Sequence, residues 1–165
     1  TMTGYTNLII EQTPKTPHID LNKFTGDLIF SGRSTPEDAS FIFEPVLKWT
    51  EQYVQNPRPS TSVRVNLDIF NTTTALWLSR VLRLLASIEL PDHTLTLHLY
   101  LPAEEYEAVK DFNDIRDAFI PIADVLHGDI HNLCIRLYSK DLKDEITASK
   151  LILLENDQYV HAEIH

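Results

Sequence analysis

Three consecutive threonines, Thr72, Thr73 and Thr74, follow an asparagine at the start of an amphipathic segment. Asn71 is a favourable N-cap residue, because its side-chain oxygen can accept a hydrogen bond from an unpaired amide of the first helical turn. Those unpaired amides and the positive end of the helix dipole favour an added anion at the neighbouring hydroxyls. A phosphorylated threonine is therefore electrostatically suited to this position. Serine and threonine are also ordinary at helix starts, so a plain polar cap explains the same residues.

The common patterns of catalytic and cofactor sites are missing from the sequence. With only 4 Gly there is neither a phosphate-cradling loop nor a dinucleotide-binding fingerprint, and no serine lies in a G-x-S-x-G pattern. The pairs His127/His131 and His161/His165 have a spacing that can hold a metal on a helix. Gly128 interrupts the first pair, however, and the second lies in strand-like sequence. We therefore expect no metal, no cofactor and no enzymatic activity.

Two further groups of residues could in principle take part in catalysis or ligand binding. Asp68, His98 and Glu104 lie near the ends of predicted strands, where α/β proteins often place their sites. A deep pocket that gathered these three side chains would favour a small enzyme or ligand binder. Cys134 is the only cysteine, which excludes a disulfide framework and a cysteine-based zinc site. Its apolar neighbours indicate a small buried hydrophobe rather than a nucleophile.

The threonines lie between a predicted strand and a predicted helix. Residues 62–70 alternate between apolar and polar types, which predicts a strand with one apolar face. The residues expected on that face are Val63, Val65, Leu67 and Ile69. The helix is expected from Thr72 to about Glu89, because its apolar residues recur at helical spacing. Residues 95–101 form the next alternating strand, so a helix connects two strands that must pair at least partly in parallel.

The N-terminal region predicts a hairpin followed by a helix. Short strands are expected at residues 8–10, 18–21 and 27–32. Thr35 is a suitable cap and Pro36 suits the first helical position, so the helix is expected to run from there to about Gln55. Pro45 lies inside this helix and should kink it or mark a later start.

The C-terminal region has a weaker pattern. Residues 104–126 predict a helix broken near Pro121, and residues 133–138 predict a strand. The segments 150–155 and 159–164 predict a hairpin. The expected fold is α/β, a mixed sheet with helices packed against it, plus a C-terminal extension. We place the main domain at residues 1–126 and the extension, packed on the same domain, at residues 127–165.

The composition is that of a soluble globular protein. The chain has 165 residues, 43% of them hydrophobic and 23% charged, with a formal net charge of −10. This charge argues against nucleic acid or an anionic membrane as the main partner. No apolar run reaches the length of a membrane helix and no signal-peptide pattern is present, so we expect a cytoplasmic protein.

Two motifs resemble those of a known protein family. The first is Ser31-Gly32-Arg33-Ser34-Thr35-Pro36-Glu37-Asp38-Ala39, and the second is Leu67-Asp68-Ile69-Phe70-Asn71-Thr72-Thr73-Thr74. Together with Thr13-Pro14, Asp20 and Thr25-Gly26, they resemble the SiaC family of bacterial regulatory phosphoproteins over about residues 7–101. The chain departs from the family after this match, where roughly sixty further residues follow.

The resemblance implies a fold similar to the STAS and anti-sigma-factor-antagonist group, and a partner-switching role. By motif position it implies that Thr72 is the phosphoacceptor of a protein kinase and a Ser/Thr phosphatase. It also implies that the unphosphorylated form binds a diguanylate cyclase and so controls cyclic di-GMP signalling. The expected partner-binding residues are Asn71, Thr73, Thr74 and Trp77. The alternative is a scaffolding or homodimerisation module that uses the C-terminal hairpin, with the threonines acting only as caps.

Overall fold

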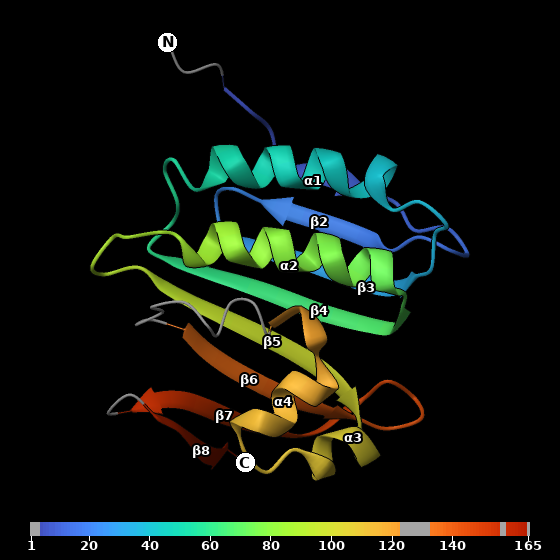
Figure 1. The fold of residues 1–165 in the computed structure, drawn as a ribbon, viewed down its shortest axis with the longest axis vertical. Coiled ribbons are helices and arrows are strands. Elements are labelled where there is room, and N and C mark those ends of the chain that lie inside the picture. Colours follow the sequence, from blue (N-terminus) through green and yellow to red (C-terminus); the bar gives the residue numbers. More distant parts are fainter. Residues whose placement is uncertain (1–3, 123–132, 156–157, 165) are drawn as a thin grey trace.

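An eight-stranded mixed sheet runs through the chain with its strands in sequential order (Figure 1). The computed structural model describes residues 4–122, 133–155 and 158–164. The strands are β1 (Leu8–Ile10), β2 (His18–Asn22), β3 (Asp27–Ser34), β4 (Ser60–Phe70), β5 (Thr94–Pro102), β6 (Leu133–Lys140), β7 (Ile146–Glu155) and β8 (Gln158–Ile164). The four central strands, β3 to β6, are parallel, and the pairs at both ends of the sheet are antiparallel. The predicted mixed sheet is confirmed.

The described helices all cover the same face of the sheet, as Figure 1 shows. They are α1 (Ser40–Tyr53), α2 (Thr72–Ala86), α3 (Ala103–Ala108), α4 (Phe112–Ala118) and the 3-10 turn η1 (Ile120–Ile122). The parallel strands follow one another in a single direction across the sheet. Because crossovers between parallel strands are right-handed, successive connections in one direction place their helices on one face. The opposite face of the sheet carries none of the described helices.

The hydrophobic core lies between the sheet and this helical layer. Its largest fully buried side chains come from both layers and include Leu28, Phe30, Phe43, Tyr53, Leu78, Leu85, Leu97, Leu99, Ile115 and Ile122. The alternation predicted for β4 and β5 is confirmed for Val63, Val65 and Leu67, which are all buried. On β5 the buried residues are Leu95, Leu97, Leu99 and Leu101. Residues on the opposite face of these strands are mostly polar.

The position of Ile69 differs from the prediction. A register shift leaves Asp68 as an extra residue in β4, since Gly32 pairs with Leu67 and Arg33 pairs with Ile69. A bulge of this kind reverses the alternation beyond it. Ile69 is consequently 48% exposed rather than buried with the apolar face.

The predicted start of the first helix is wrong. Strand β3 continues to Ser34, and α1 begins only at Ser40, whose amide donates to Asp38 Oδ1 at 2.9 Å. Thr35 and Pro36 lie in the connection and cap nothing. The Thr35 amide donates to the Lys15 carbonyl at 2.8 Å. This hydrogen bond holds the segment against the loop between β1 and β2, so the segment does not form a helical turn.

Other boundaries shift by a few residues or break. Helix α1 continues through Pro45 and ends at Tyr53, and α2 ends at Ala86. The expected helix over 104–126 breaks near Pro121 as predicted, where η1 follows α4. It also breaks between α3 and α4, where Asp111 and Asp114 form a capping box that starts α4. The predicted C-terminal hairpin is present, with β7 and β8 antiparallel. No helix among the described residues is long and apolar enough to cross a membrane.

Candidate phosphorylation site at the start of helix α2

Asn71 joins the end of β4 to α2 and caps the helix as predicted. Its backbone is extended (φ −94°, ψ 178°), and its side-chain oxygen accepts a hydrogen bond from the Thr74 amide at 3.1 Å. The same oxygen lies 3.0 Å from Thr73 Oγ1 and 2.9 Å from Thr74 Oγ1. The amide nitrogen Nδ2 donates to the Pro36 carbonyl at 2.6 Å. One side chain therefore ties the helix start to the loop between β3 and α1.

The three threonines differ sharply in their surroundings. Thr74 is fully buried, and its hydroxyl lies 2.7 Å from Ser34 Oγ and 3.2 Å from the Ser34 carbonyl. Thr73 is half-buried and donates to Asn71. Thr72 is exposed, and its hydroxyl has no hydrogen-bond partner among the described residues. Only Thr72 combines an accessible oxygen with freedom from the capping network.

The start of α2 is electrostatically favourable for an anion. The helix has 15 residues, so its dipole is developed, and its first turn contains no acidic residue. Asn71 satisfies the Thr74 amide, and the Ala75 amide donates to the Asn71 carbonyl. The amides of Thr72 and Thr73 precede the first intrahelical bond and are the ones left for an added group. A phosphate on the Thr72 side chain would lie beside these donors.

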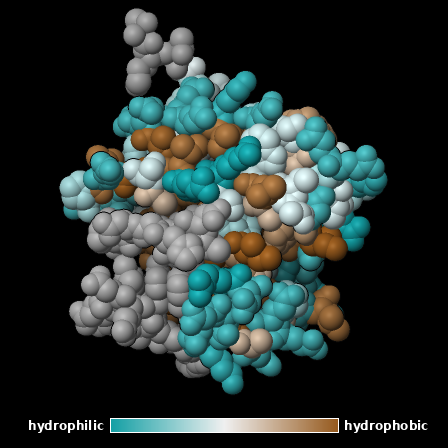
Figure 2. All heavy atoms as spheres, viewed as in Figure 1, coloured by the Kyte–Doolittle hydropathy of each residue, from teal (hydrophilic) through white to brown (hydrophobic). Residues whose placement is uncertain are grey.

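Exposed apolar side chains lie on the same side of α2 as Thr72. Leu76, one turn further along, is 58% exposed. Ser79, the next residue along that side, donates to the Pro121 carbonyl at 3.1 Å and so brings η1 against the helix. Ile120 in η1 is 70% exposed. We call Thr72, Leu76 and Ile120 the α2 surface; Figure 2 shows hydrophobic residues interrupting the hydrophilic surface on this helix-covered side of the molecule.

The other residues predicted to bind a partner differ in how far they are available to it. Asn71 and Thr74 are engaged within the chain, as described above. Trp77 is half-buried against the core, and the Arg80 guanidinium lies 4.7 Å from the centre of its ring. Its exposed part can add to the α2 surface. Leu76 lies off the apolar stripe of α2, which accounts for its exposure. Ile120 lies beside Pro121, where the helix was predicted to break and where η1 follows α4.

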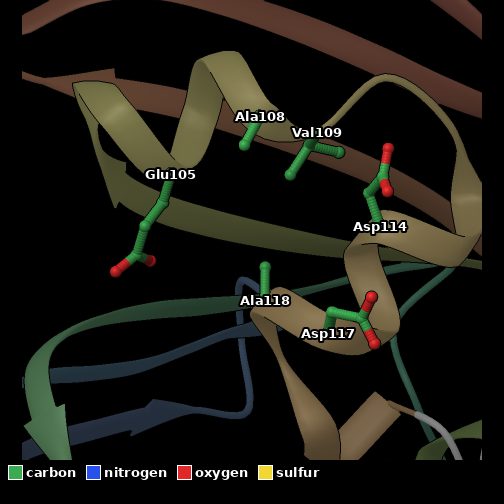
Figure 3. A pocket seen from close by; sticks show the side chains of 6 residues that line it. All are labelled: Glu105, Ala108, Val109, Asp114, Asp117 and Ala118. Carbon is green, nitrogen blue, oxygen red and sulfur yellow. The ribbon is translucent and has the colours of Figure 1, made fainter.

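Two cavities lie near α3. One, of about 170 Å³, is lined by the carboxyl ends of β4 and β5 together with Phe119 and Glu105. The other, of about 370 Å³, lies between α3 and α4, where Glu105, Asp114 and Asp117 line it (Figure 3). No group of metal-binding side chains occurs among the described residues.

The alternative site at the strand ends does not form. Asp68 contacts Lys140 at 3.3 Å, whereas His98 lies on the open face of the sheet, 2.8 Å from the Tyr138 hydroxyl. Neither His98 nor Glu104 lines the cavity that includes Asp68. The pair His127/His131 lies outside the described residues, as do the side chains of the His161/His165 pair.

Comparison with known proteins decides the family. The model of the SiaC family of regulatory phosphoproteins matches residues 10–125. The chain belongs to the SiaC family. No curated protein matches the chain in sequence. The SiaC match ends before β6, so strands β6 to β8 lie beyond it.

Solved SiaC structures share the fold. Apo-SiaC from Pseudomonas aeruginosa superposes with a TM-score of 0.59 at 20% identity, over 79% of this chain and 98% of that chain. SiaC of the same organism in complex with the diguanylate cyclase SiaD, of which it is the activator, gives a TM-score of 0.61 at 19% identity. That match covers 81% of this chain and 98% of the other. At sequence identities of 20% and 19%, this structural likeness shows that the chain shares the fold of SiaC.

Proposed function

We propose that this chain is a non-enzymatic regulatory phosphoprotein whose state is set by reversible phosphorylation of Thr72. The observation that carries the proposal is the contrast within the threonine triplet. The Thr72 hydroxyl is exposed and outside the capping network, whereas the Thr74 hydroxyl is buried and bonded to Ser34. A kinase can reach the first without unfolding the helix start.

The protein itself tolerates the added phosphate. Phosphorylation adds about −1.5 to −2 charges and three acceptor oxygens. The helix start offsets this charge by about 0.3–1 kcal/mol through its dipole. No carboxylate in the first turn of α2 opposes it. The change is therefore local, and its consequence falls on whatever docks on the α2 surface.

A partner that covers Leu76 and Ile120 would also cover Thr72. Burying these apolar side chains against a neutral threonine is favourable, at roughly 25 cal/mol per Å² of apolar surface. Burying a dianion without a paired cation costs several kcal/mol, enough to abolish such a complex. The unphosphorylated protein is thus the binding form.

The partner we infer is a diguanylate cyclase, so that the output is cyclic di-GMP. This inference rests on membership of the SiaC family and on the SiaC–SiaD complex, which has the same fold on the SiaC side. A protein kinase and a Ser/Thr phosphatase would act on Thr72. The reactions belong to those enzymes and to the cyclase, and we place the switch in the cytoplasm.

Phosphosite mapping tests the acceptor. The wild-type chain and the variants Thr72→Ala and Thr73→Ala are incubated with the cognate kinase and ATP, and the products are analysed by mass spectrometry. We expect one phosphate on wild type and on Thr73→Ala, and none on Thr72→Ala. Unchanged labelling of Thr72→Ala would refute the assignment.

Partner capture tests the switch. Binding of the cognate cyclase is compared for wild type, Thr72→Ala, Thr72→Asp and the charge-matched control Ser60→Asp. Ser60 is exposed at the start of β4, at the opposite end of this strand from Asn71. We expect loss of binding only for Thr72→Asp. Equal loss with Ser60→Asp would mean that net charge, rather than the site, governs binding.

A second candidate is a homodimeric scaffold. Strand β8 is last in the sheet order, and no other strand of the described residues pairs with its outer edge. That edge could pair with the same strand of a second copy of the chain. In this case Thr72→Asp leaves every partner interaction intact. Removal of residues 158–165 then converts a dimer to a monomer in sedimentation, whereas the phospho-switch requires no such dimer.

A further inference from the structure

A row of cationic and aromatic side chains crosses the sheet face that lacks helices. Arg64 on β4 pairs in register with His98 on β5, and His98 pairs with Arg136 on β6. Because side chains alternate along a strand, all three point away from the helical layer. Tyr100 and Tyr138 stand on the same face, paired with each other two residues further along. We call these five residues the arginine–tyrosine surface.

Four of the five side chains of this surface, all but that of Arg136, are held in place by one another. The Arg64 guanidinium donates to the Tyr100 hydroxyl at 3.0 Å, and the rings of Tyr100 and Tyr138 stack with centroids 4.4 Å apart. The Tyr138 hydroxyl lies 2.8 Å from His98 Nδ1. A surface already ordered in this way loses little side-chain entropy when a partner binds.

Within the described part of the chain, the charges of the two arginines are not offset by a carboxylate in contact with them. Neither Arg64 nor Arg136 contacts a carboxylate among the described residues, and Arg136 has no hydrogen-bond partner there. Burial lowers the pKa of His98 to about 4, with help from both guanidinium groups, so the imidazole between them is neutral and adds no further cation. Lys140 on the same strand contrasts with them, because it contacts Asn66 at 2.7 Å and Asp68 at 3.3 Å. In a chain of net charge −10, the two arginines place two positive charges near each other on one face of the sheet.

We propose that the arginine–tyrosine surface binds an acidic segment of a partner protein. The guanidinium groups match carboxylates in charge and in bidentate geometry. Arginine and tyrosine are also the residue types most enriched where protein interfaces gain their affinity. The row extends across three neighbouring strands, a shape suited to a protein segment rather than to a small ligand, which prefers a concave site. The affinity of a protein for nucleic acid depends on many cationic contacts, and this surface supplies only its two arginines.

This surface is distinct from the α2 surface and does not rest on the function proposed above. Arg136 and Tyr138 belong to β6, which begins after the SiaC match ends at residue 125. The remaining members, Arg64, His98 and Tyr100, lie within the match. Strand β6, which lies beyond the family match, thus completes a face of which the matched region provides only a part.

A defined acidic probe tests the proposal. A fluorescein-labelled peptide of about ten glutamates is titrated with the full chain at about 20 mM salt, where screening is weak, and followed by anisotropy. The double variant Arg64→Gln/Arg136→Gln is compared with Lys48→Gln/Arg58→Gln, which removes two exposed cations elsewhere and keeps the same net charge. We expect a roughly tenfold or greater loss of affinity in the first variant and less than about twofold in the second, since charge-assisted pairs dominate.

A charge-conserving variant and a folding control complete the experiment. Arg64→Lys/Arg136→Lys keeps the charge but not the bidentate geometry, and we expect an intermediate affinity. Thermal melts of each variant show whether it is folded. No binding of the peptide by wild type at low salt, or equal binding by wild type and the Arg64→Gln/Arg136→Gln variant, overturns the proposal. Tighter binding of a single-stranded oligonucleotide of matched length than of the peptide overturns the assigned class of partner.

Discussion

The same substitution, threonine to valine, should have opposite consequences at two positions two residues apart. Valine keeps the shape of threonine and replaces its hydroxyl with a methyl group. At Thr74 it removes contacts with Ser34 and Asn71 from a fully buried site. At Thr72 it removes an exposed hydroxyl without partners among the described residues.

The expected magnitudes follow from these contacts. Thr74→Val leaves the Ser34 hydroxyl, which is itself fully buried, without its partner at 2.7 Å. An unsatisfied buried polar group costs about 1–3 kcal/mol, and the lost hydrogen bond adds about 1 kcal/mol. We expect a total of about 2–4 kcal/mol for Thr74→Val and less than about 0.5 kcal/mol for Thr72→Val. For a chain of this size the first value lowers Tm by roughly 4–16 °C.

The assay combines unfolding with phosphorylation. Urea unfolding and thermal melts give the two free-energy changes, and kinase labelling is measured at a temperature where both variants are folded. We expect Thr74→Val to be destabilised but labelled, and Thr72→Val to be stable but unlabelled. Equal destabilisation by the two variants, or loss of labelling in folded Thr74→Val, would show that our division between a structural and a regulatory threonine is wrong.

Three further predictions concern other parts of the fold. Lys150→Met should lower the free energy of unfolding by about 2–4 kcal/mol in urea, because the buried ammonium donates to the carbonyls of Tyr106 and Val109 at 2.8 and 2.6 Å and these lose their donor. Gly26→Ala should lower Tm and reduce soluble yield, because Gly26 has φ +78° and an added Cβ would lie 2.4 Å from a backbone oxygen. The imidazole of His98 should titrate near its lowered pKa of about 4 in NMR, below its usual 6.5. The neutral form is favoured in the folded state, so stability is retained above pH 6.5 and decreases as the pH falls towards 4, a decrease that His98→Gln should reduce.

The sequence predicted the elements whose patterns are local. Alternation along β4 and β5 and the helical spacing in α2 both depend on burial against a single layer, and both were read correctly. The cap at Asn71 was also predictable, because its side chain bonds to an amide only three residues ahead. These features need no knowledge of the distant parts of the chain.

Features set by distant contacts were not predictable in this way. Pro36 looked like a first helical residue, but its carbonyl accepts from Asn71, 35 residues later in the sequence, and the chain stays outside the helix. Ile69 followed the alternation of its strand, but the bulge at Asp68 arises from pairing with β3. The arginine–tyrosine surface was likewise invisible, because it depends on β4, β5 and β6 being neighbours in register.

The sheet order separates the two proposed surfaces, although strand β4 carries Arg64 of one and leads to Thr72 of the other. Helix α2 follows β4 and starts at the carboxyl edge of the parallel strands, whereas the arginine–tyrosine surface lies on the sheet face turned away from the helices. A partner on one therefore leaves the other free. Strand β4 connects them, since Asn66 and Asp68, just before the Thr72 segment, both contact the buried Lys140 of β6.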